Sequence, residues 1–447
     1  MSSESAFDAD RRDADLVFEA LKNRIGEAKP EKRLDATRWV LDLMGDPQQM
    51  YGVIHLAGTN GKTSTARIIE SLLRAHGLRT GLMTSPHLHR VNERMVIDGE
   101  PISDRMLCDN WADVEPFIAM VDAELVADGR APLTYFEALT VLGFAAFADA
   151  PVDVAVIECG MGGEWDATNV ANADVAVLTP IALDHMEQLG YTIGEIARTK
   201  AGIIKPATRV VSAEQTSEAW NEIIVACKRD EAPLSALGRD FSLTDVQPAV
   251  GGQLISVSGL AGEYRDMFLP LMGDHQATNA AVALAAVESF LGNGEQKLGA
   301  EIVEEGIALA SSPGRLQIIS RNPTVIVDAA HNPHGAEALT RALMTSFSFD
   351  RLICVVGVLA GKDVVGIIEA LDPVVNHFVV TQSQSDRAIS VADLADAVSA
   401  IAGPDRVDSR AISDDALARA LDLAGSDGGV IVTGSITLVA EVTEGAS

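Results

Sequence analysis

The fold is decided by the stretch Val53-Ile54-His55-Leu56-Ala57-Gly58-Thr59-Asn60-Gly61-Lys62-Thr63-Ser64. Its first five residues form a mostly apolar run, which predicts a buried strand. A turn bounded by glycines follows, and then a helical pattern whose apolar residues share one face until Gly77 ends it. A strand, a glycine-rich loop, Lys-Thr and a helix, in that order, form the layout of a phosphate-binding loop. The stretch therefore predicts a nucleotide site.

Two side chains of this loop have the chemistry that a nucleotide requires. Lys62 can reach the terminal phosphates, and the hydroxyl of Thr63 can bind Mg²⁺. The full nucleotide-loop pattern G-x-x-x-x-G-K-[ST] is not met, because Leu56 stands where its first glycine belongs. An ordinary glycine turn that opens a helix is the alternative. The strand, the Lys-Thr pair and the helix in register favour the phosphate loop.

The length and the charge of the chain limit its organisation and its partners. A chain of 447 residues exceeds what one core usually supports, so two or three domains are expected. The formal net charge of −30 disfavours nucleic acid and anionic membranes as partners. Any site for an anionic substrate must therefore be locally cationic or hold a metal ion.

The cysteines and the N-terminus indicate a cytoplasmic protein. The four cysteines are widely spaced and form no C-x-x-C pair, so neither a zinc site nor a disulfide framework is expected. The polar, acidic N-terminus does not resemble a signal peptide, and no apolar run approaches the length of a membrane span. We expect a monomer in the cytoplasm.

Strands and helices alternate through the first half of the chain. Disorder is expected over residues 1–13, and only about fifty residues precede the loop strand, too few for a separate N-terminal substrate domain. Helices are predicted at 14–28, 36–44, 101–128 and 134–147, and further strands at 79–84, 152–157 and 175–178. This alternation predicts a doubly wound, mainly parallel sheet. The carboxyl ends of its strands, where ligands bind in such sheets, carry Lys62, Ser85, Glu158 and His185.

The second half of the chain predicts a small antiparallel sheet and then another α/β unit. Short, glycine-punctuated strands are expected over residues 241–269, followed by a long helix at 275–290. The best domain boundary is Ser311-Ser312-Pro313-Gly314, which divides the chain into residues 1–312 and 313–447. Elements of the second unit are predicted at 324–327, 335–344, 352–358, 377–381 and 429–433. The predicted class is α/β with two doubly wound domains, the first a P-loop ATPase domain and the second Rossmann-like.

Several polar residues stand beside these predicted strands or at a helix end, and each has an ordinary explanation as well as a functional one. Glu158 can hold Mg²⁺ near the phosphates or be a solvated acid at a strand end. Asp166 can belong to a site or to a plain Asx turn. His185 is a candidate ligand, although a lone histidine is more often structural. For Lys200, the residues alone favour a helix-end lysine that complements the helix dipole.

Two stretches of the second unit also have both a functional and an ordinary explanation. Arg315, just after the domain boundary, can reach a phosphate across the cleft between the domains. The stretch Asp328-Ala329-Ala330-His331-Asn332-Pro333 ends a predicted strand and begins a helix, on the ligand edge of a sheet. Ordinary loop and cap chemistry explains both stretches equally well. Two ligand edges suggest a cleft that closes over a nucleotide.

Taken together, these residues resemble the folylpolyglutamate synthase/dihydrofolate synthase family, within the Mur-type ATP-dependent ligases. The loop from Gly58 to Ser64 is similar to the shortened phosphate loop of that family, which accounts for Leu56. Other similar blocks, in the order of the family, are Thr84-Ser85-Pro86-His87-Leu88, Phe136-Glu137, Gly160-Met161-Gly162-Gly163, Asp166-Ala167-Thr168-Asn169, Leu183-Asp184-His185, Lys200-Ala201-Gly202-Ile203, Gly273-Asp274-His275-Gln276 with Asn279, Pro313-Gly314-Arg315 and Asp328-Ala329-Ala330-His331-Asn332-Pro333.

The resemblance implies a role for each of these groups. ATP would be bound by Gly58, Thr59, Asn60, Gly61, Lys62, Thr63, Ser64, Asn279, Arg315 and Asp328. Two Mg²⁺ ions would be held by Thr63, Ser85, Glu158, His185 and Lys200, the last carbamylated by CO₂, and K⁺ is a further candidate cation. The substrates would contact Ser85, Pro86, His87, Phe136, Gly162, Gly163, Asp166 and His331, with the loop from Gly162 to Asp166 forming part of the pterin site. The catalytic groups would be Lys62, His185, Lys200, Arg315 and His331.

The activity that the resemblance implies is ATP-dependent ligation of L-glutamate to a pteroate or folate carboxylate, through an acyl phosphate. The substrates would be 7,8-dihydropteroate or reduced folates, L-glutamate and ATP. One alternative is a Mur-type ligase that adds an amino acid to a cell-wall nucleotide precursor. The other is a P-loop nucleotide-binding module without ligase chemistry, against which the metal-ligand set argues. ATP use that depends on both glutamate and a pteroate distinguishes the three.

Overall fold

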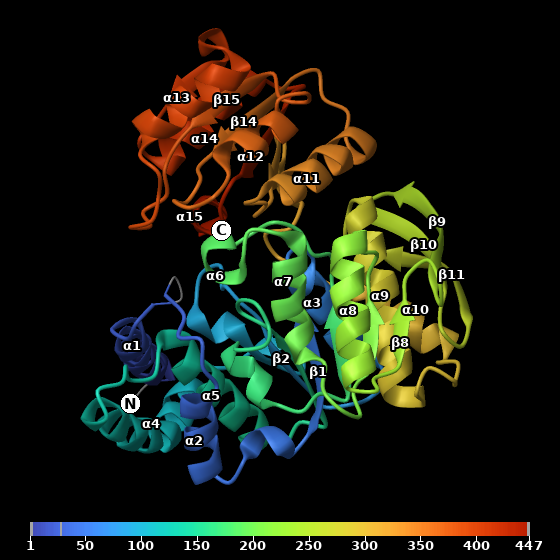
Figure 1. The fold of residues 1–447 in the computed structure, drawn as a ribbon. Helices are drawn as coiled ribbons and strands as arrows, with labels where there is room; N and C mark the ends of the chain where they lie inside the picture. The colour runs from blue at the N-terminus through green and yellow to red at the C-terminus, as the bar shows by residue number, and fades with distance from the viewer. Residues whose placement is uncertain (1–2, 27–28, 445–447) are drawn as a thin grey trace.

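Three β-sheets organise the computed structural model, which describes residues 3–26 and 29–444. A sheet of eight strands and a sheet of three lie in the first part of the chain, and a sheet of six lies in the last part among these described residues. Figure 1 shows the six-stranded sheet and its helices as a separate lobe, from orange to red, that faces α3, α6 and α7 of the larger body. The predicted α/β class is confirmed.

The loop strand is central in the eight-stranded sheet, whose order is β4-β3-β2-β5-β1-β6-β7-β8. β1 pairs in parallel with β5 on one side and with β6 on the other. The strands are β1 (Gly52–Ala57), β2 (Thr80–Met83), β3 (Met95–Ile97), β4 (Glu100–Pro101), β5 (Val154–Glu158), β6 (Val175–Leu178), β7 (Arg209–Ser212) and β8 (Leu234–Ala236). This central position explains the apolar run, because a strand covered on both faces is apolar throughout.

Helices cover both faces of this sheet. Ile54 and Leu56 of β1 join the core formed with α3 and α9, whereas Val53 packs on the opposite face with α2, α4 and α5. The alternation follows from the two-residue period of a strand. The helices of this part are α1 (Ser3–Lys22), α2 (Asp35–Leu43), α3 (Lys62–Ala75), α4 (Asp104–Ala127), α5 (Tyr135–Asp149), α6 (Met186–Leu189), α7 (Ile193–Lys200), α8 (Ser217–Arg229), α9 (Asp274–Gly292) and α10 (Ala300–Ala308).

The prediction of disorder over residues 1–13 is wrong, because α1 begins at Ser3, although residues 1–2 lie outside the described residues. Ala14, Val17 and Leu21 of α1 are buried in the core that α4 and α5 share. Most of the other residues of this helix are polar or charged, so its first turns look disordered when read alone. Tertiary burial of one narrow face stabilises it. The last two residues of the predicted helix 14–28 also lie outside the described residues.

The start of α4 also differs from its prediction. The predicted helix began at residue 101, but Pro101 pairs in the short strand β4, and α4 begins at Asp104. The hydroxyl of Ser103 accepts a hydrogen bond from the backbone N–H of Met106, so Ser103 caps the helix. A serine cap of this kind sets the first turn of a helix.

The small antiparallel sheet is confirmed and has the order β11-β10-β9. Its strands are β9 (Ser242–Ala249), β10 (Gly252–Ser258) and β11 (Glu263–Leu269). Buried residues of β10 and β11, including Ile255 and Met267, join the core that α9 and α10 share. The sheet therefore belongs to the first part of the chain, and it lies at the side of that body in Figure 1.

The last part of the chain forms the six-stranded sheet, in the order β12-β13-β17-β14-β15-β16. Only β12 is antiparallel to its neighbour. The strands are β12 (Gln317–Arg321), β13 (Thr324–Val327), β14 (Leu352–Val356), β15 (His377–Val380), β16 (Val407–Ser409) and β17 (Gly429–Thr433). The helices are α11 (Pro333–Ser346), α12 (Val364–Leu371), α13 (Val391–Ala402), α14 (Ser413–Ala424) and α15 (Ile436–Glu444). Because the strands of the other two sheets all end before residue 312, we propose domains at 1–312 and 313–447, called here the N-terminal and C-terminal domains.

None of the helices in residues 3–26 and 29–444 combines the length and the apolar character that crossing a bilayer requires.

The core beside β2 provides a test of the fold. Phe147 is fully buried, and its ring lies where a Cβ on Gly81 would be 2.8 Å from the ring atom Cδ1. We expect Phe147→Ala to lower the free energy of unfolding by about 3–5 kcal/mol, because it removes apolar contacts and leaves a cavity. Urea denaturation followed by circular dichroism measures this change. Leu16→Ala, on a side chain that is 68% exposed, is the control. Equal effects of the two substitutions would contradict the described packing.

Candidate active site

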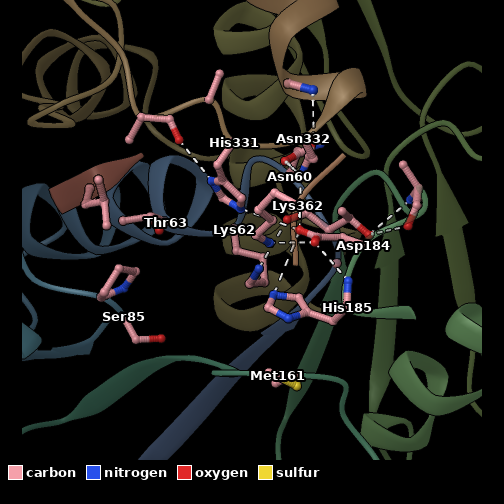
Figure 2. A pocket seen from close by; sticks show the side chains of 18 of the residues that line it. Asn60, Lys62, Thr63, Ser85, Met161, Asp184, His185, His331, Asn332 and Lys362 are labelled. Carbon is pink, nitrogen blue, oxygen red and sulfur yellow. Dashed lines mark hydrogen bonds and ion pairs between the residues drawn. The ribbon is translucent and has the colours of Figure 1, made fainter. Parts of the chain in front are cut away.

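A cavity of about 2010 Å³ lies where the carboxyl edges of the two parallel sheets face each other. Its lining includes the phosphate loop after β1, Glu158 at the end of β5 and the segment after β6. From the C-terminal domain it includes the segments that follow β13, β14, β15 and β17. Figure 2 shows side chains of both domains pointing into this space. Parallel α/β sheets bind ligands at this edge, so the cavity is the candidate active site.

The glycines of the phosphate loop allow close contacts that a side chain would prevent. A Cβ on Gly58 would lie 1.9 Å from the hydroxyl oxygen of Thr179 at the end of β6. Gly61 has a φ of +85°, and its Cβ would lie 2.7 Å from the amide oxygen of Asn279. Thr59 is held as well, because its hydroxyl donates to the carbonyl of Ala182 and accepts from the N–H of that residue, each at 3.0 Å. The loop is therefore tightly packed between its neighbours.

The first turn of α3 carries Lys62 and Ser64. The ammonium of Lys62 donates to the carbonyl of Thr59 at 3.3 Å, so it lies over the loop. The hydroxyl of Ser64 is 2.9 Å from that of Ser312, at the proposed domain boundary, and accepts a hydrogen bond from Gln276. The start of the helix therefore contacts the junction between the domains directly.

Three polar groups meet at the end of β5: the carboxylate of Glu158, the hydroxyl of Thr63 and the backbone N–H of Ser85. The hydroxyl of Thr63 lies 3.0 Å from both carboxylate oxygens of Glu158, and the N–H of Ser85 donates to Oε2 at 3.3 Å. Burial raises the pKa of Glu158, although the charge of Lys62 and these hydrogen bonds oppose the shift. A buried carboxylate beside a hydroxyl is the type of donor set that Mg²⁺ prefers. The residues therefore fit one such ion.

The other two predicted metal ligands, His185 and Lys200, both have a side-chain pKa below the ordinary value of their residue type. His185 precedes α6 with a φ of +50°, and burial lowers the pKa of its imidazole to about 3, so the ring is neutral and able to bind a metal. Lys200 ends α7 and donates to the carbonyl of Gly58 at 2.6 Å. Burial, with the charge of Lys62, lowers the pKa of Lys200 to about 7. As an amine, Lys200 supplies no anionic oxygen for a second cation.

In the described part of the chain, no three His, Cys, Asp or Glu side chains gather closely enough to hold a metal ion. Of the five predicted metal ligands, only Glu158 and His185 are His, Cys, Asp or Glu residues. The absence of three such side chains close together among the described residues therefore does not test the predicted metal site. The set of five metal ligands stays a prediction.

The C-terminal domain presents its own groups to the cavity. Asp328 follows β13, and its carboxylate accepts from the N–H groups of Leu316 and Ala330 at 2.8 Å each. His331 lies in the same turn, with Nδ1 2.9 Å from the carbonyl of Ala329. Arg315 also lines the cavity, and its contact with ATP stays a prediction. The turn after β13 thus places a carboxylate and an imidazole near the arginine.

Sequence reasoning gave no role to Asp184, although the structure places its carboxylate among groups of both domains. Oδ1 accepts from the ammonium of Lys362 at 2.6 Å, and Oδ2 accepts from the amide of Asn332 at 3.1 Å. Nε2 of His331 is 3.5 Å from Oδ2. Burial opposes ionisation, but the hydrogen bond to His331 and the nearby positive charges hold the pKa of Asp184 well below its usual range. Figure 2 shows these groups pointing toward one another.

Part of the predicted substrate-binding set also lines the cavity. Ser85, Pro86, His87, Phe136 and Asp166 all line it. Burial, with the charge of a nearby arginine, lowers the pKa of His87 to about 3, so its ring is neutral. The ring of Phe136 lies against the backbone of the loop after β5. An aromatic ring and neutral groups suit an aromatic ligand.

Asp166 holds the loop after β5 in place from within. Its carboxylate accepts from the N–H of Met161 at 2.7 Å and from the hydroxyl of Thr168 at 2.5 Å. Gly162 and Gly163 do not line the cavity. They allow the loop to approach α7, since a Cβ on Gly163 would lie 2.7 Å from the carbonyl oxygen of Lys200. Their predicted contact with the substrate stays a prediction, and packing explains why both residues are glycines.

Two family models match the chain. The Mur ligase middle domain matches residues 56–287, and the glutamate ligase domain of Mur ligases matches residues 314–436. The first match spans more than half of the chain, and the second falls within the C-terminal domain.

The chain is also similar over nearly its whole length to named proteins. The dihydrofolate synthase/folylpolyglutamate synthase of Mycobacterium tuberculosis is 45% identical over 446 residues, which cover 94% of this chain and 90% of that protein. The structure of Mycobacterium tuberculosis folylpolyglutamate synthase complexed with ADP matches with a TM-score of 0.94 at 42% identity, covering 98% of this chain and 99% of that one. The structure of Escherichia coli FolC in complex with DHPP and ADP matches with a TM-score of 0.85 at 31% identity, covering 97% of each chain. The chain belongs to the folylpolyglutamate synthase/dihydrofolate synthase family of Mur ligases.

Proposed function

We propose that this protein is an ATP-dependent ligase that joins L-glutamate to the carboxylate of a pteroate or a reduced folate. The observation that carries the proposal is the meeting of two sets of groups around one cavity. Lys62, Thr63 and Glu158 come from the N-terminal domain, and Arg315 and His331 come from the C-terminal domain. The names of the relatives, and the ADP and DHPP in their structures, support the assignment.

The reaction joins two anions, so its main requirement is positive charge. An oxygen of the substrate carboxylate attacks the γ-phosphorus of ATP, the bond from that phosphorus to the β,γ-bridging oxygen breaks, and ADP leaves with the electron pair. The amine of glutamate then attacks the acyl carbon, loses a proton, and phosphate leaves with the original carboxylate oxygen. Lys62 and Arg315 line the cavity and supply charge to the phosphates. Cationic positioning of this kind counters the net charge of −30 on the chain.

The metal sites form part of the proposal. Thr63 and Glu158, with Ser85 beside them, would hold Mg²⁺, which adds positive charge at the phosphates when bound. A second Mg²⁺ would need another anionic ligand near His185. Lys200 can provide it by carbamylation, in which its neutral amine forms an N–C bond to CO₂ and releases a proton. A pKa lowered to about 7 by burial leaves a large neutral fraction of Lys200 for this step. K⁺ remains a further candidate cation.

The end of the cavity that carries Phe136, His87 and Asp166 is the proposed pterin side. ATP would contact the phosphate loop from Gly58 to Ser64 together with Asn279, Arg315 and Asp328. Glutamate would approach from the C-terminal domain, near His331. The free thiols of all four cysteines support a reducing cytoplasm as its location. The monomeric state and the location stay predictions.

The two alternative functions, a cell-wall ligase and a nucleotide-binding module, predict different use of ATP. A cell-wall ligase would consume ATP with a nucleotide-linked sugar peptide as acceptor. A binding module would consume no ATP when glutamate and a pteroate are supplied. The names of the relatives favour the folate reaction. The test is phosphate release by the purified protein with ATP, Mg²⁺ and L-glutamate, with dihydropteroate and tetrahydrofolate in parallel. Release that requires both glutamate and one of these acceptors supports the proposal, and release that requires neither contradicts it.

The phosphate loop can be tested by Lys62→Ala. We expect turnover at saturating ATP to fall by about 100-fold or more, because the loop from Gly58 to Ser64 has Lys62 as its one cationic side chain for the phosphates. The melting temperature should stay within a few degrees, since the ammonium makes one long hydrogen bond, to the carbonyl of Thr59 at 3.3 Å. Lys228→Met, on the exposed face of α8, is the matched control. Unchanged turnover would remove Lys62 from the site.

The carbamate on Lys200 can be tested by Lys200→Ala. We expect this variant to be nearly inactive and to recover part of its turnover when short carboxylic acids such as acetate are added. A small carboxylate would occupy the gap and replace the missing anionic oxygen. A lysine that only ends α7 predicts a loss of about 1 kcal/mol or less in stability and normal catalysis. Full activity of Lys200→Ala, measured by phosphate release, would exclude the carbamate.

The buried amine of Lys200 also has a consequence for stability. Burial lowers the pKa of Lys200 from 10.5 to about 7 in the folded protein, so the unfolded chain binds more protons between these values. Wild-type stability should therefore rise with pH across this window, and Lys200→Met should lack that rise. We expect the melting temperature of Lys200→Met minus that of wild type to be largest near pH 7 and to shrink toward pH 10, in buffer without CO₂ or metal. A difference independent of pH would contradict the buried amine.

A further inference from the structure

Five side chains connect the two domains beside the phosphate loop, and we call them the interdomain clasp: Asn60, Asp184, His331, Asn332 and Lys362. Asn60 and Asn332 face each other, and each amide nitrogen lies 3.1 Å from the other's amide oxygen. Asn332 also donates to Asp184, which binds the ammonium of Lys362 at 2.6 Å. Figure 2 shows the clasp with Asp184 between His185 and Lys362. Asn332 thus contacts the N-terminal domain at two points.

We propose that Asp184 is a positioning residue that fixes Lys362 and the turn of His331 and Asn332 against the phosphate loop. The inference rests on the proposed function, since it assigns a role in the same reaction. Asp184 follows β6 in the N-terminal domain, where the imidazole of His185 lies 3.9 Å from its carboxylate. Its other side-chain partners, Lys362, His331 and Asn332, belong to the C-terminal domain. One carboxylate therefore holds two segments of the other domain, the turn after β13 and the segment before α12.

Burial makes this contact sensitive to loss of one partner. The side chains of Asp184 and Lys362 are 9% and 11% exposed. Among the described residues, no other carboxylate forms an ion pair with Lys362. Removing one member of a buried pair leaves the other charge uncompensated. The other side chains that face Asp184 are two imidazoles and an amide, so none of them supplies a negative charge for Lys362.

The clasp is hydrogen-bonded to the backbone of both domains. On one side, Oδ1 of Asp184 accepts from the N–H of His185 at 2.8 Å, so the carboxylate is tied to the backbone of a predicted metal ligand. On the other side, the amide oxygen of Asn332 accepts from the N–H of Gly335 at 2.8 Å and caps α11. We therefore expect a displacement of α11 to move Asn60 and His185 as well. Because misplaced reacting groups slow catalysis strongly, the clasp bears on kcat more than on nucleotide binding.

The test combines Asp184→Asn, Lys362→Met and the double variant. Asp184→Asn keeps the shape and the backbone hydrogen bond but removes the charge. Asp408→Asn is the matched control, since it removes a carboxylate that is 28% exposed and paired with Arg419 inside the C-terminal domain. For each protein, phosphate release gives kcat and KM, and small-angle scattering gives the radius of gyration. Wild type is measured alongside, so absence of its turnover identifies a failure of the proposed function, while the scattering data still report on the clasp.

We expect each single variant to lose about tenfold or more in kcat, with KM for ATP changed less than about threefold. The double variant should be no worse than the poorer single variant, because both remove one interaction. Asp184→Asn should have a larger radius of gyration than wild type, and Asp184→Glu should recover part of kcat. Losses that multiply in the double variant would overturn the proposal. So would a lower melting temperature with normal kcat and an unchanged radius of gyration, which would make Asp184 a structural residue only.

Discussion

Concentrating positive charge at one sheet edge is the physical constraint on which the rest of this structure depends. A carboxylate can approach a phosphate only where cations offset their repulsion, and the chain as a whole carries a formal net charge of −30. The parallel strands solve this by bringing Lys62 and Lys200 to the loop after β1, and the second domain adds Arg315 and Lys362. The positive charges of these lysines and the arginine also repel one another. Burial keeps part of Lys200 neutral, and Asp184 compensates Lys362.

Much of the fold could be predicted because its elements have strong local patterns. Strand β6 lies where the apolar run predicted it, at Val175–Leu178, and the phosphate loop has its strand and helix in register. Short strands at or next to a sheet edge, such as β3, β4 and β16, were not predicted, since two or three residues carry no periodicity. The first helix was missed for a different reason. Its buried face consists of Ala14, Val17 and Leu21, and only packing against the neighbouring helices explains why it is ordered.

The candidate site, like the fold, could be predicted from the sequence only in part. That Thr63 and Glu158 would lie close together followed from a general rule, because the loop after β1 leads to Thr63 and Glu158 ends the neighbouring parallel strand β5. The pairing of Asp184 with Lys362 could not follow from the residues, since 178 positions separate them and the contact depends on how the domains are placed. For Lys200, the position could be predicted but the chemical environment could not. Its position at the end of a helix was predicted, but the burial that lowers the pKa of its amine is a tertiary property. Local chemistry predicts which groups are available, and tertiary structure decides which of them act together.

The central claim is that the substrate carboxylate is activated by transfer of phosphate within this cavity. Isotope transfer tests it most directly, because the carboxylate oxygen that attacks ATP leaves with phosphate. The acceptor is labelled with ¹⁸O in its carboxylate and incubated with ATP, Mg²⁺, L-glutamate and the enzyme, and the phosphate released is analysed by mass spectrometry. The account predicts one ¹⁸O atom in each phosphate formed with amide. Phosphate without the label, alongside normal amide formation, would contradict it.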